Sequence, residues 1–131
     1  MKSFKSLSHC QFSCKYHVIW CPKYRRKVLI GTIAVRLKEL LTIKAKELNV
    51  EILESELMPD HVHLLLDTLP TEAIGTIIGR LKGYTSKNLR AEFPELKRRL
   101  PTLWTNSYFV STVGGVTLNV LKQYIENQKN K

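Results

Sequence analysis

The sequence is short of acidic residues and cysteines, and it lacks a long apolar run. Its 131 residues include 11 aspartates and glutamates against 21 lysines and arginines, which gives a formal net charge of +10. No apolar stretch reaches the roughly 20 residues that a helix needs to cross a bilayer. Residues 1–8 are polar and basic, without the apolar region of a secretory signal. We therefore expect a cytoplasmic protein with no membrane partner.

The three cysteines lie close together, at positions 10, 14 and 21. An odd number in a chain without a secretory signal argues against a disulfide framework. His9 and His17 lie among them, so a structural zinc site is one alternative. Zinc ligands usually come as close pairs separated by a longer loop, and five candidates strung along one strand cannot converge on one ion. The cysteines are more typical of small buried side chains.

Internal repeats, low-complexity tracts and linkers are also absent, so residues 1–131 are expected to form one domain. Hydrophobic residues make up 44% of the chain, as in an ordinary globular protein. The shortage of acidic residues favours a polyanionic partner, and nucleic acid is the commonest one. A basic surface that merely aids solubility is the alternative.

Hydrophobic periodicity predicts seven secondary-structure elements. Strands are expected at Gln11–Cys21, Val50–Met58, His61–Asp67 and Leu103–Thr112. Helices are expected at Thr32–Leu48, from Pro70 and Thr71 onward with Thr71 as N-cap, and from about Thr117 to Gln128. The charged stretch Phe93–Pro101 is expected to be a loop, and Gly79 and Gly83 count against a fully regular second helix.

The order of these elements is β-α-β-β-α-β-α. The first six match the split βαβ pattern, which predicts an α+β, ferredoxin-like antiparallel sheet with two helices on one face. Pro59 and Asp60 have turn chemistry, so the second and third strands should form a hairpin. The last helix is additional, and residues 113–116, with Gly114 and Gly115, are expected to be its hinge.

Two histidines, His61 and His63, lie two positions apart on the third predicted strand. Strand side chains alternate between faces, so both imidazoles point the same way. Two adjacent imidazoles can share a divalent cation, although such a pair also occurs at surfaces and in packing.

Tyr124 and Gln128 lie four positions apart on the final helix, which places them on one face, one turn apart. A tyrosine can attack a phosphodiester if a nearby metal polarises the phosphate and helps the phenol to lose its proton. Gln128 offers a neutral oxygen to the same ion. The alternative is a tyrosine at the edge of the core and a solvated glutamine.

Two basic segments suit a nucleic-acid surface. Lys23, Tyr24, Arg25, Arg26 and Lys27 combine cations with an aromatic ring that could stack on a base. The second helix and its surroundings contribute Arg80, Lys82, Lys87 and Arg90. Solvated charged surfaces are the alternative at both places.

Four segments together resemble the TnpA-like single-tyrosine HUH transposases of the smallest bacterial insertion sequences. They are Tyr16–Lys27, the histidine–hydrophobic–histidine segment Pro59–Leu65, Leu103–Val110 with Val113–Gly114, and Tyr124–Gln128. The segments occur in the family's order, and the resemblance covers nearly the whole chain.

The resemblance implies a role for each residue. It implies that His61, His63 and Gln128 bind Mg²⁺ or Mn²⁺ and that Tyr124, on a catalytic helix within residues 117–131, is the nucleophile. It also implies a homodimer in which the tyrosine helix of one subunit completes the histidine site of the other. The implied substrate is single-stranded DNA with hairpins at the element ends, cleaved to leave a 5′-phosphotyrosine and a free 3′-hydroxyl.

Two further hypotheses stay open beside the DNA transposase. One is a related HUH nuclease that processes palindromic repeats of the host. The other is a non-enzymatic basic ferredoxin-like domain that only binds nucleic acid. A pure binder has no need for the combination of His61, His63, Tyr124 and Gln128.

Overall fold

The computed structural model describes residues 5–7, 10–113 and 118–131. Its strands are β1 (Lys5–Leu7), β2 (Cys10–Phe12), β3 (Lys15–Trp20), β4 (Glu51–Met58), β5 (His61–Asp67) and β6 (Phe109–Thr112). Its helices are the 3-10 helix η1 (Lys23–Arg25) and the α-helices α1 (Gly31–Glu47), α2 (Ile74–Glu92), α3 (Pro94–Arg99) and α4 (Leu118–Asn127).

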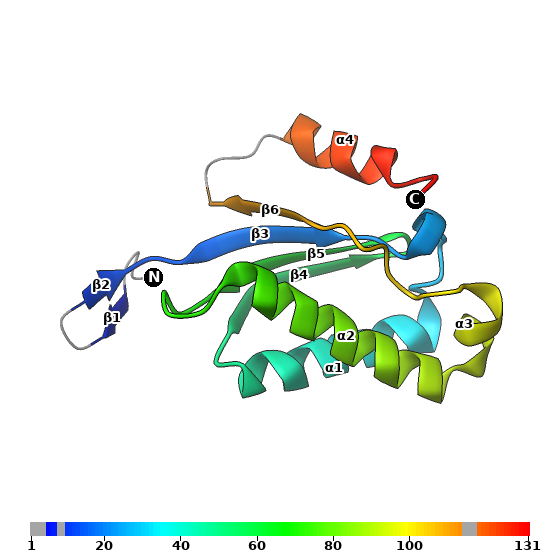
Figure 1. Cartoon of the computed structure of the whole chain (residues 1–131), viewed down its shortest axis with the longest axis horizontal. Helices are drawn as coiled ribbons and strands as arrows, with labels where there is room; N and C mark the ends of the chain where they lie inside the picture. Colours follow the sequence, from blue (N-terminus) through cyan, green and yellow to red (C-terminus); the bar gives the residue numbers. More distant parts are fainter. Residues whose placement is uncertain (1–4, 8–9, 114–117) are drawn as a thin grey trace.

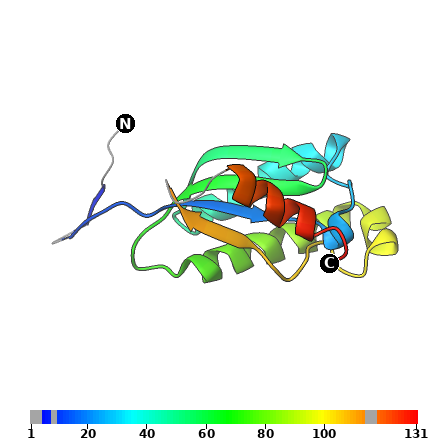
Figure 2. The same cartoon turned by 90° about the horizontal axis from the view of Figure 1, so that it is seen from above.

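The central sheet has the order β4-β5-β3-β6, and every neighbouring pair is antiparallel. With β1 and β2 set aside, this is the sheet order that the split βαβ pattern predicts, so the predicted α+β fold is confirmed. Helices α1 and α2 cover one face of the sheet and α4 lies over the other (Figure 1). Strands β1 and β2 form a separate hairpin that projects beyond the sheet (Figures 1 and 2).

The alternation of side chains along β5 separates the core from the open face. Val62, Leu64 and Leu66 are fully buried and pack into the core under α1 and α2. His61, His63 and Leu65 are only half-buried, because they point to the face over which α4 lies. The hairpin of β4 and β5 is confirmed, with Met58 paired to His61 across the turn.

Helix α1 forms nearly as predicted, since its apolar residues recur at helical spacing. The buried residues Ile33, Leu37, Leu40 and Leu41 face the sheet, while the lysines Lys38 and Lys46 stay exposed. Helix α2 continues through Gly79 and Gly83, both of which lie on its exposed side with open space around them. The two glycines, which in the sequence counted against a regular helix, therefore do not interrupt it.

Two predicted boundaries were wrong, one in the first strand and one at the start of the second helix. The first strand is interrupted after Phe12: Cys10–Phe12 pairs with β1 in a separate hairpin, and the strand of the central sheet begins at Lys15. Helix α2 starts at Ile74, and Ala73 occupies the N-cap position without a side-chain bond. Thr71 lies in the preceding turn, so it is not the N-cap.

The expected loop at 93–101 contains the short helix α3. Pro94 takes the first helical position, Glu95 lies in the first turn, and three basic residues end the helix. This arrangement satisfies both the proline geometry and the helix dipole. Leu96, which is fully buried, holds the helix against the core.

The fourth predicted strand begins late, at Phe109. Residues 103–108 have no strand partner of their own beyond an isolated bridge between Trp104 and Pro22. The final helix matches its prediction from Leu118 on, whereas Gly114 and Gly115, predicted as the hinge, lie outside the described residues. No helix in the described part of the chain is long and apolar enough to cross a membrane.

Candidate active site on the open face of the sheet

His61 begins β5 and is oriented by the residue before it. Nδ1 of His61 lies 2.9 Å from Oδ1 of Asp60. An ionised carboxylate only accepts hydrogen bonds, so the imidazole nitrogen donates. In the neutral ring this leaves the lone pair on Nε2, which is the arrangement that supporting carboxylates give to metal-binding histidines.

His63 lies on the same face and contacts a third histidine. Nε2 of His63 lies 3.2 Å from Nδ1 of His17 on β3, and the ring centroids are 5.4 Å apart. When His63 is the donor in this pair, its Nδ1 keeps a lone pair for a cation. In the sequence His17 stood out only as a zinc candidate. Its contact with His63 depends on the register of β3 against β5, which pairs Ile19 with His63.

Burial lowers the pKa of His63 below its ordinary value of 6.5, and the charge of His17 lowers it further. We expect a histidine-ring NMR titration of the metal-free protein to give a midpoint below 6.5 for His63. The unfolded chain binds this proton more readily, so His63 should make the free energy of unfolding fall as the pH drops below 6.5. His17→Gln removes the second cause and should move the midpoint upward. A wild-type midpoint at or above 6.5 contradicts this prediction.

Tyr124, on α4, and Gln128, in the turn that follows this helix, lie on the same side, as the spacing predicts. The ring of Tyr124 packs on Phe109 with centroids 5.5 Å apart, and Gln128 is 97% buried, with an exposed fraction of 3%. The expectation of a solvated glutamine is therefore excluded. Burial raises the pKa of the Tyr124 phenol, while its hydrogen bond with Ser107 acts in the opposite direction.

Ser107 holds both of these side chains and was not singled out from the sequence. Its hydroxyl donates to Oε1 of Gln128 at 2.8 Å and lies 3.3 Å from the Tyr124 hydroxyl. Either hydroxyl can be the donor in the second contact. Ser107 in turn lies on a segment whose carbonyls bind Lys82: Nζ donates to Thr105 at 2.6 Å and to Ser107 at 3.1 Å.

Arg25 links the tyrosine helix to the histidine strand. Its Nη1 lies 3.0 Å from Oε2 of Glu126 on α4, and its Nε lies 3.5 Å from Oδ2 of Asp60. Tyr24 and Arg25 have positive φ angles of 58° and 50°. A left-handed conformation in a residue other than glycine costs of order 1–3 kcal/mol and persists where the surroundings impose it.

Tyr124 and Gln128 share no hydrogen bond with His61 or His63 within the described ranges 5–7, 10–113 and 118–131. The register pairs Ile19 with both His63 and Phe109, so Phe109, on which Tyr124 packs, lies on the same sheet face as the histidines. Helix α4 lies over this face, with its C-terminal end next to η1 (Figures 1 and 2). The connection between the two pairs is indirect and runs through Glu126, Arg25 and Asp60.

Eight of the nine residues predicted to bind DNA fall into two groups. Tyr24, Arg26, Lys27, Arg80 and Lys87 are exposed. The other group is at least half-buried and has partners within the protein: Arg25, Lys82, whose pKa burial lowers to about 8, and Arg90, which donates to the carbonyl of Leu100. Arg80 and Lys87 lie on α2, in the layer opposite to the histidines. DNA contact stays a prediction for both groups and for Lys23.

The two cysteines whose side chains the structure describes, Cys14 and Cys21, do not lie together. Cys14 and Cys21 flank the two ends of β3, seven positions apart, or about 23 Å at strand spacing. Burial raises the pKa of Cys21 to about 12. The described residues also contain no group of three or more histidines, cysteines or carboxylates placed to hold a metal.

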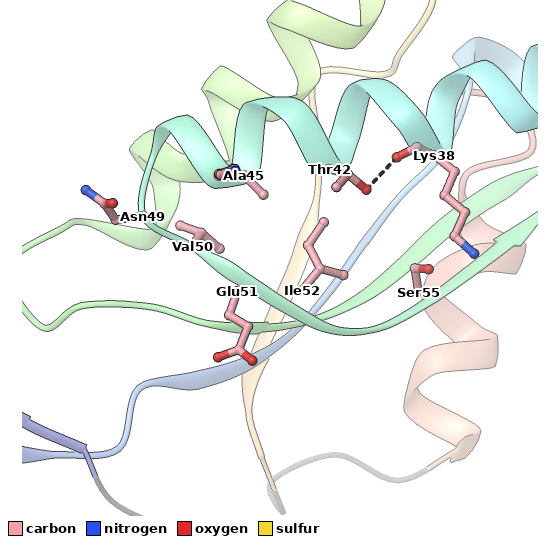
Figure 3. Close-up of a pocket in the computed structure, with 9 residues that line it drawn as sticks. Lys38, Thr42, Ala45, Asn49, Val50, Glu51, Ile52 and Ser55 are labelled. Carbon is pink, nitrogen blue, oxygen red and sulfur yellow. Dashed lines mark hydrogen bonds between the residues drawn. The ribbon is translucent and has the colours of Figure 1, made fainter.

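Two hollows lie on either side of β4. One, of about 410 Å³, is lined by Glu54, Glu56 and His63 with Ser55 and Leu65, and it opens beside the candidate site. Its carboxylates favour a cation next to His63. A second, of about 590 Å³, lies between α1 and β4 (Figure 3). It includes Lys38, Thr42 and Ile52 and is lined by none of the predicted site residues among those described.

Comparison with known protein families establishes which family this chain belongs to. The family model for IS200-like transposases matches residues 10–128. The protein belongs to the IS200-like transposase family. The resemblance that the sequence motifs carry is confirmed at this level, and family membership implies DNA cleavage and strand transfer.

Relatives support the assignment over almost the whole chain. The chain is 40% identical over 122 residues to the ISDra2 transposase TnpA of Deinococcus radiodurans, covering 92% of this chain and 87% of the relative. It is 37% identical over 126 residues to the transposase for insertion sequence element IS200 of Salmonella typhimurium, covering 95% and 82%.

Solved structures of transposases share the fold. The crystal structure of a candidate transposase from Deinococcus radiodurans matches with a TM-score of 0.90 and 37% identity, covering 97% of this chain and 99% of the other. A REP-associated tyrosine transposase bound to a REP hairpin matches with a TM-score of 0.59 and 11% identity, covering 92% and 69%. At that identity the second likeness shows the fold alone.

Proposed function

We propose that this transposase cuts and rejoins single-stranded DNA beside a hairpin through a covalent bond to Tyr124. The observation that supports the proposal best is the placement of α4: it brings Tyr124 and Gln128 over the sheet face that carries His61 and His63. The Tyr124 hydroxyl also makes a hydrogen bond with Ser107, which acts to lower its pKa against the effect of burial.

The proposed cleavage replaces one phosphorus–oxygen bond with another. The Tyr124 phenol gives up its proton and its oxygen attacks the phosphorus, while the bond to the 3′ oxygen breaks. The 3′ oxygen takes up a proton, leaving a 5′-phosphotyrosine and a free 3′-hydroxyl. In rejoining, another 3′-hydroxyl attacks this linkage and the tyrosine oxygen leaves. The number of phosphodiester bonds is unchanged, so no ATP is required.

The donor atoms of the open face fit a divalent cation such as Mg²⁺ or Mn²⁺. Imidazole nitrogens from His61 and His63 and the amide oxygen of Gln128 suit Mn²⁺, and the amide oxygen keeps a second lone pair beside its bond to Ser107. Glu54 and Glu56 add negative charge beside His63. A bound cation supplies polarisation of the phosphate and makes loss of the phenol proton easier. That help is needed because burial raises the pKa of Tyr124.

The proposal includes a homodimer in which α4 of one subunit completes the histidine site of the other. In the single chain α4 lies over its own sheet and is held there by Arg25. Exchange of α4 between subunits would have to break the contacts of Arg25 with Ile125 and Glu126. The two arrangements use the same side chains, so the chemistry is the same in both.

Incubation with end-labelled hairpin single strands tests the proposal. With Mn²⁺ or Mg²⁺ we expect a labelled protein–DNA adduct that survives a denaturing gel, and with a chelator none. The same sequence as a fully paired duplex is the control substrate and should give no adduct. DNA binding that is unaffected by chelator, with no adduct on any hairpin from the flanks of the gene, would instead identify a nucleic-acid-binding domain.

A further inference from the structure

Arg25 is enclosed between two segments that are far apart in the sequence. Its side chain is only 15% exposed and lies between Asp60, which precedes β5, and Glu126 on α4. Nη1 also approaches the carbonyl oxygen of Ile125 at 3.4 Å. A guanidinium carries five N–H donors in a rigid plane, so one arginine can bind both carboxylates at once.

The backbone around Arg25 is fixed in the conformation that this bridge needs. The backbone N–H of Arg25 donates to the carbonyl of Pro22 at 2.8 Å, and Lys23 donates to the carbonyl of Leu103 at 2.8 Å. Tyr24 and Arg25 are both left-handed within this short turn. Such conformations are found where neighbouring contacts impose them, and they often accompany a functional constraint.

Both partners of Arg25 lead directly to groups of the proposed active site. Asp60 uses one oxygen for Arg25 and the other for Nδ1 of His61. Ile125 and Glu126 lie between Tyr124 and Gln128 on the last turns of α4. A cation is also favourable there, because the C-terminal end of a helix carries partial negative charge.

We propose that Arg25 is a positioning residue that couples the metal-binding histidine His61 to the tyrosine helix. One guanidinium steadies the His61 ring through Asp60 and docks α4 through Glu126 and the Ile125 carbonyl. The two halves of the site therefore depend on one side chain. The metal-binding part of this inference rests on the proposed function.

Two DNA-free measurements test the coupling: Mn²⁺ affinity by calorimetry and hydrogen exchange of the α4 amides. Arg25→Gln should weaken Mn²⁺ binding about tenfold or more, as loss of a residue that supports a ligand does. It should also speed exchange in α4 roughly two- to fivefold, the size expected from a partly exposed ion pair. Arg25→Lys should recover no more than one of the two effects, because an ammonium cannot span both carboxylates.

Single-partner variants separate the two arms of the bridge. Glu126→Gln should speed exchange in α4 and leave Mn²⁺ affinity within about twofold of wild type. Asp60→Asn should weaken Mn²⁺ binding and leave the exchange rates of α4 close to those of wild type. Arg36→Gln is the matched control, because Arg36 pairs with Glu92 at 2.8 Å on the opposite layer, and it should change neither measurement.

The outcomes separate this inference from the proposed function. If wild-type protein forms the DNA adduct but Arg25→Gln retains both wild-type values, or alters only one of them, the coupling is overturned and the proposed function stands. If wild-type protein neither binds Mn²⁺ nor forms the adduct, the proposed function fails, and the coupling fails with it. The coupling is supported if Arg25→Gln both weakens Mn²⁺ binding and speeds exchange in α4, while the control Arg36→Gln changes neither.

Discussion

Tyr124→Phe is expected to abolish the covalent protein–DNA adduct and to lower strand cleavage by at least ~10³-fold, since the attacking oxygen is removed. The change should leave the fold intact, because phenylalanine retains the ring that packs on Phe109. The measurement is the denaturing-gel assay with labelled hairpin strands and Mn²⁺, at equal protein concentrations.

Tyr84→Phe is the matched control for this variant. Tyr84 lies on α2, where its ring contacts Lys44 in the layer opposite to α4. It should keep wild-type adduct formation. An adduct in Tyr124→Phe at the wild-type level would show that another residue is the nucleophile.

His61→Ala and His63→Ala are each expected to lower Mn²⁺ affinity by more than the 10–100-fold that is typical of residues that only support a ligand. Adduct formation should fall with it, because phosphate polarisation and loss of the phenol proton both depend on the cation. Calorimetry with Mn²⁺ and the gel assay check the two effects separately.

Leu65→Ala is the control for the histidine variants, since it also changes a side chain on the open face of β5 but removes no donor atom. It should bind Mn²⁺ with an affinity close to that of wild type. If the double variant of His61 and His63 still forms the adduct in the presence of chelator, the proposal that the reaction at this site depends on a metal is wrong.

The parts of the fold that could be predicted are those that one local pattern specifies. Helix α1 follows from apolar residues at helical spacing, and its observed bounds, Gly31–Glu47, differ by one residue at each end from the prediction. The hairpin of β4 and β5 follows from alternation on both sides of Pro59 and Asp60. The same-face placement of His61 and His63 follows from strand geometry, and the structure has it.

The segment before β6 could not be predicted, because a distant side chain takes its backbone acceptors. Residues 103–108 have strand-like composition, but Lys82 on α2 binds the carbonyls of Thr105 and Ser107. A lysine that is so distant in the sequence does not change the local hydrophobic pattern from which a strand is predicted. The ladder of β6 therefore starts only at Phe109.

The candidate site was predicted by residue type but not by its contacts. The pairs of His61 with His63 and of Tyr124 with Gln128 were visible as spacings. The roles of His17, Ser107 and Arg25 were not, because each depends on how two elements lie against each other. Arg25 illustrates this best: in the sequence it is one cation in a basic run, and a left-handed turn directs it inward to two carboxylates.

The alternation of side chains along β5 determines which amino-acid substitutions each position of this strand can tolerate. Val62, Leu64 and Leu66 contribute to folding through the core, while His61, His63 and Leu65 meet the open face. Neighbouring positions of β5 are thus constrained in different ways: one position by conformational stability and the next by chemistry. A lineage can repack the interior at even-numbered positions while it keeps the same reactive face, or alter that face without loss of the scaffold.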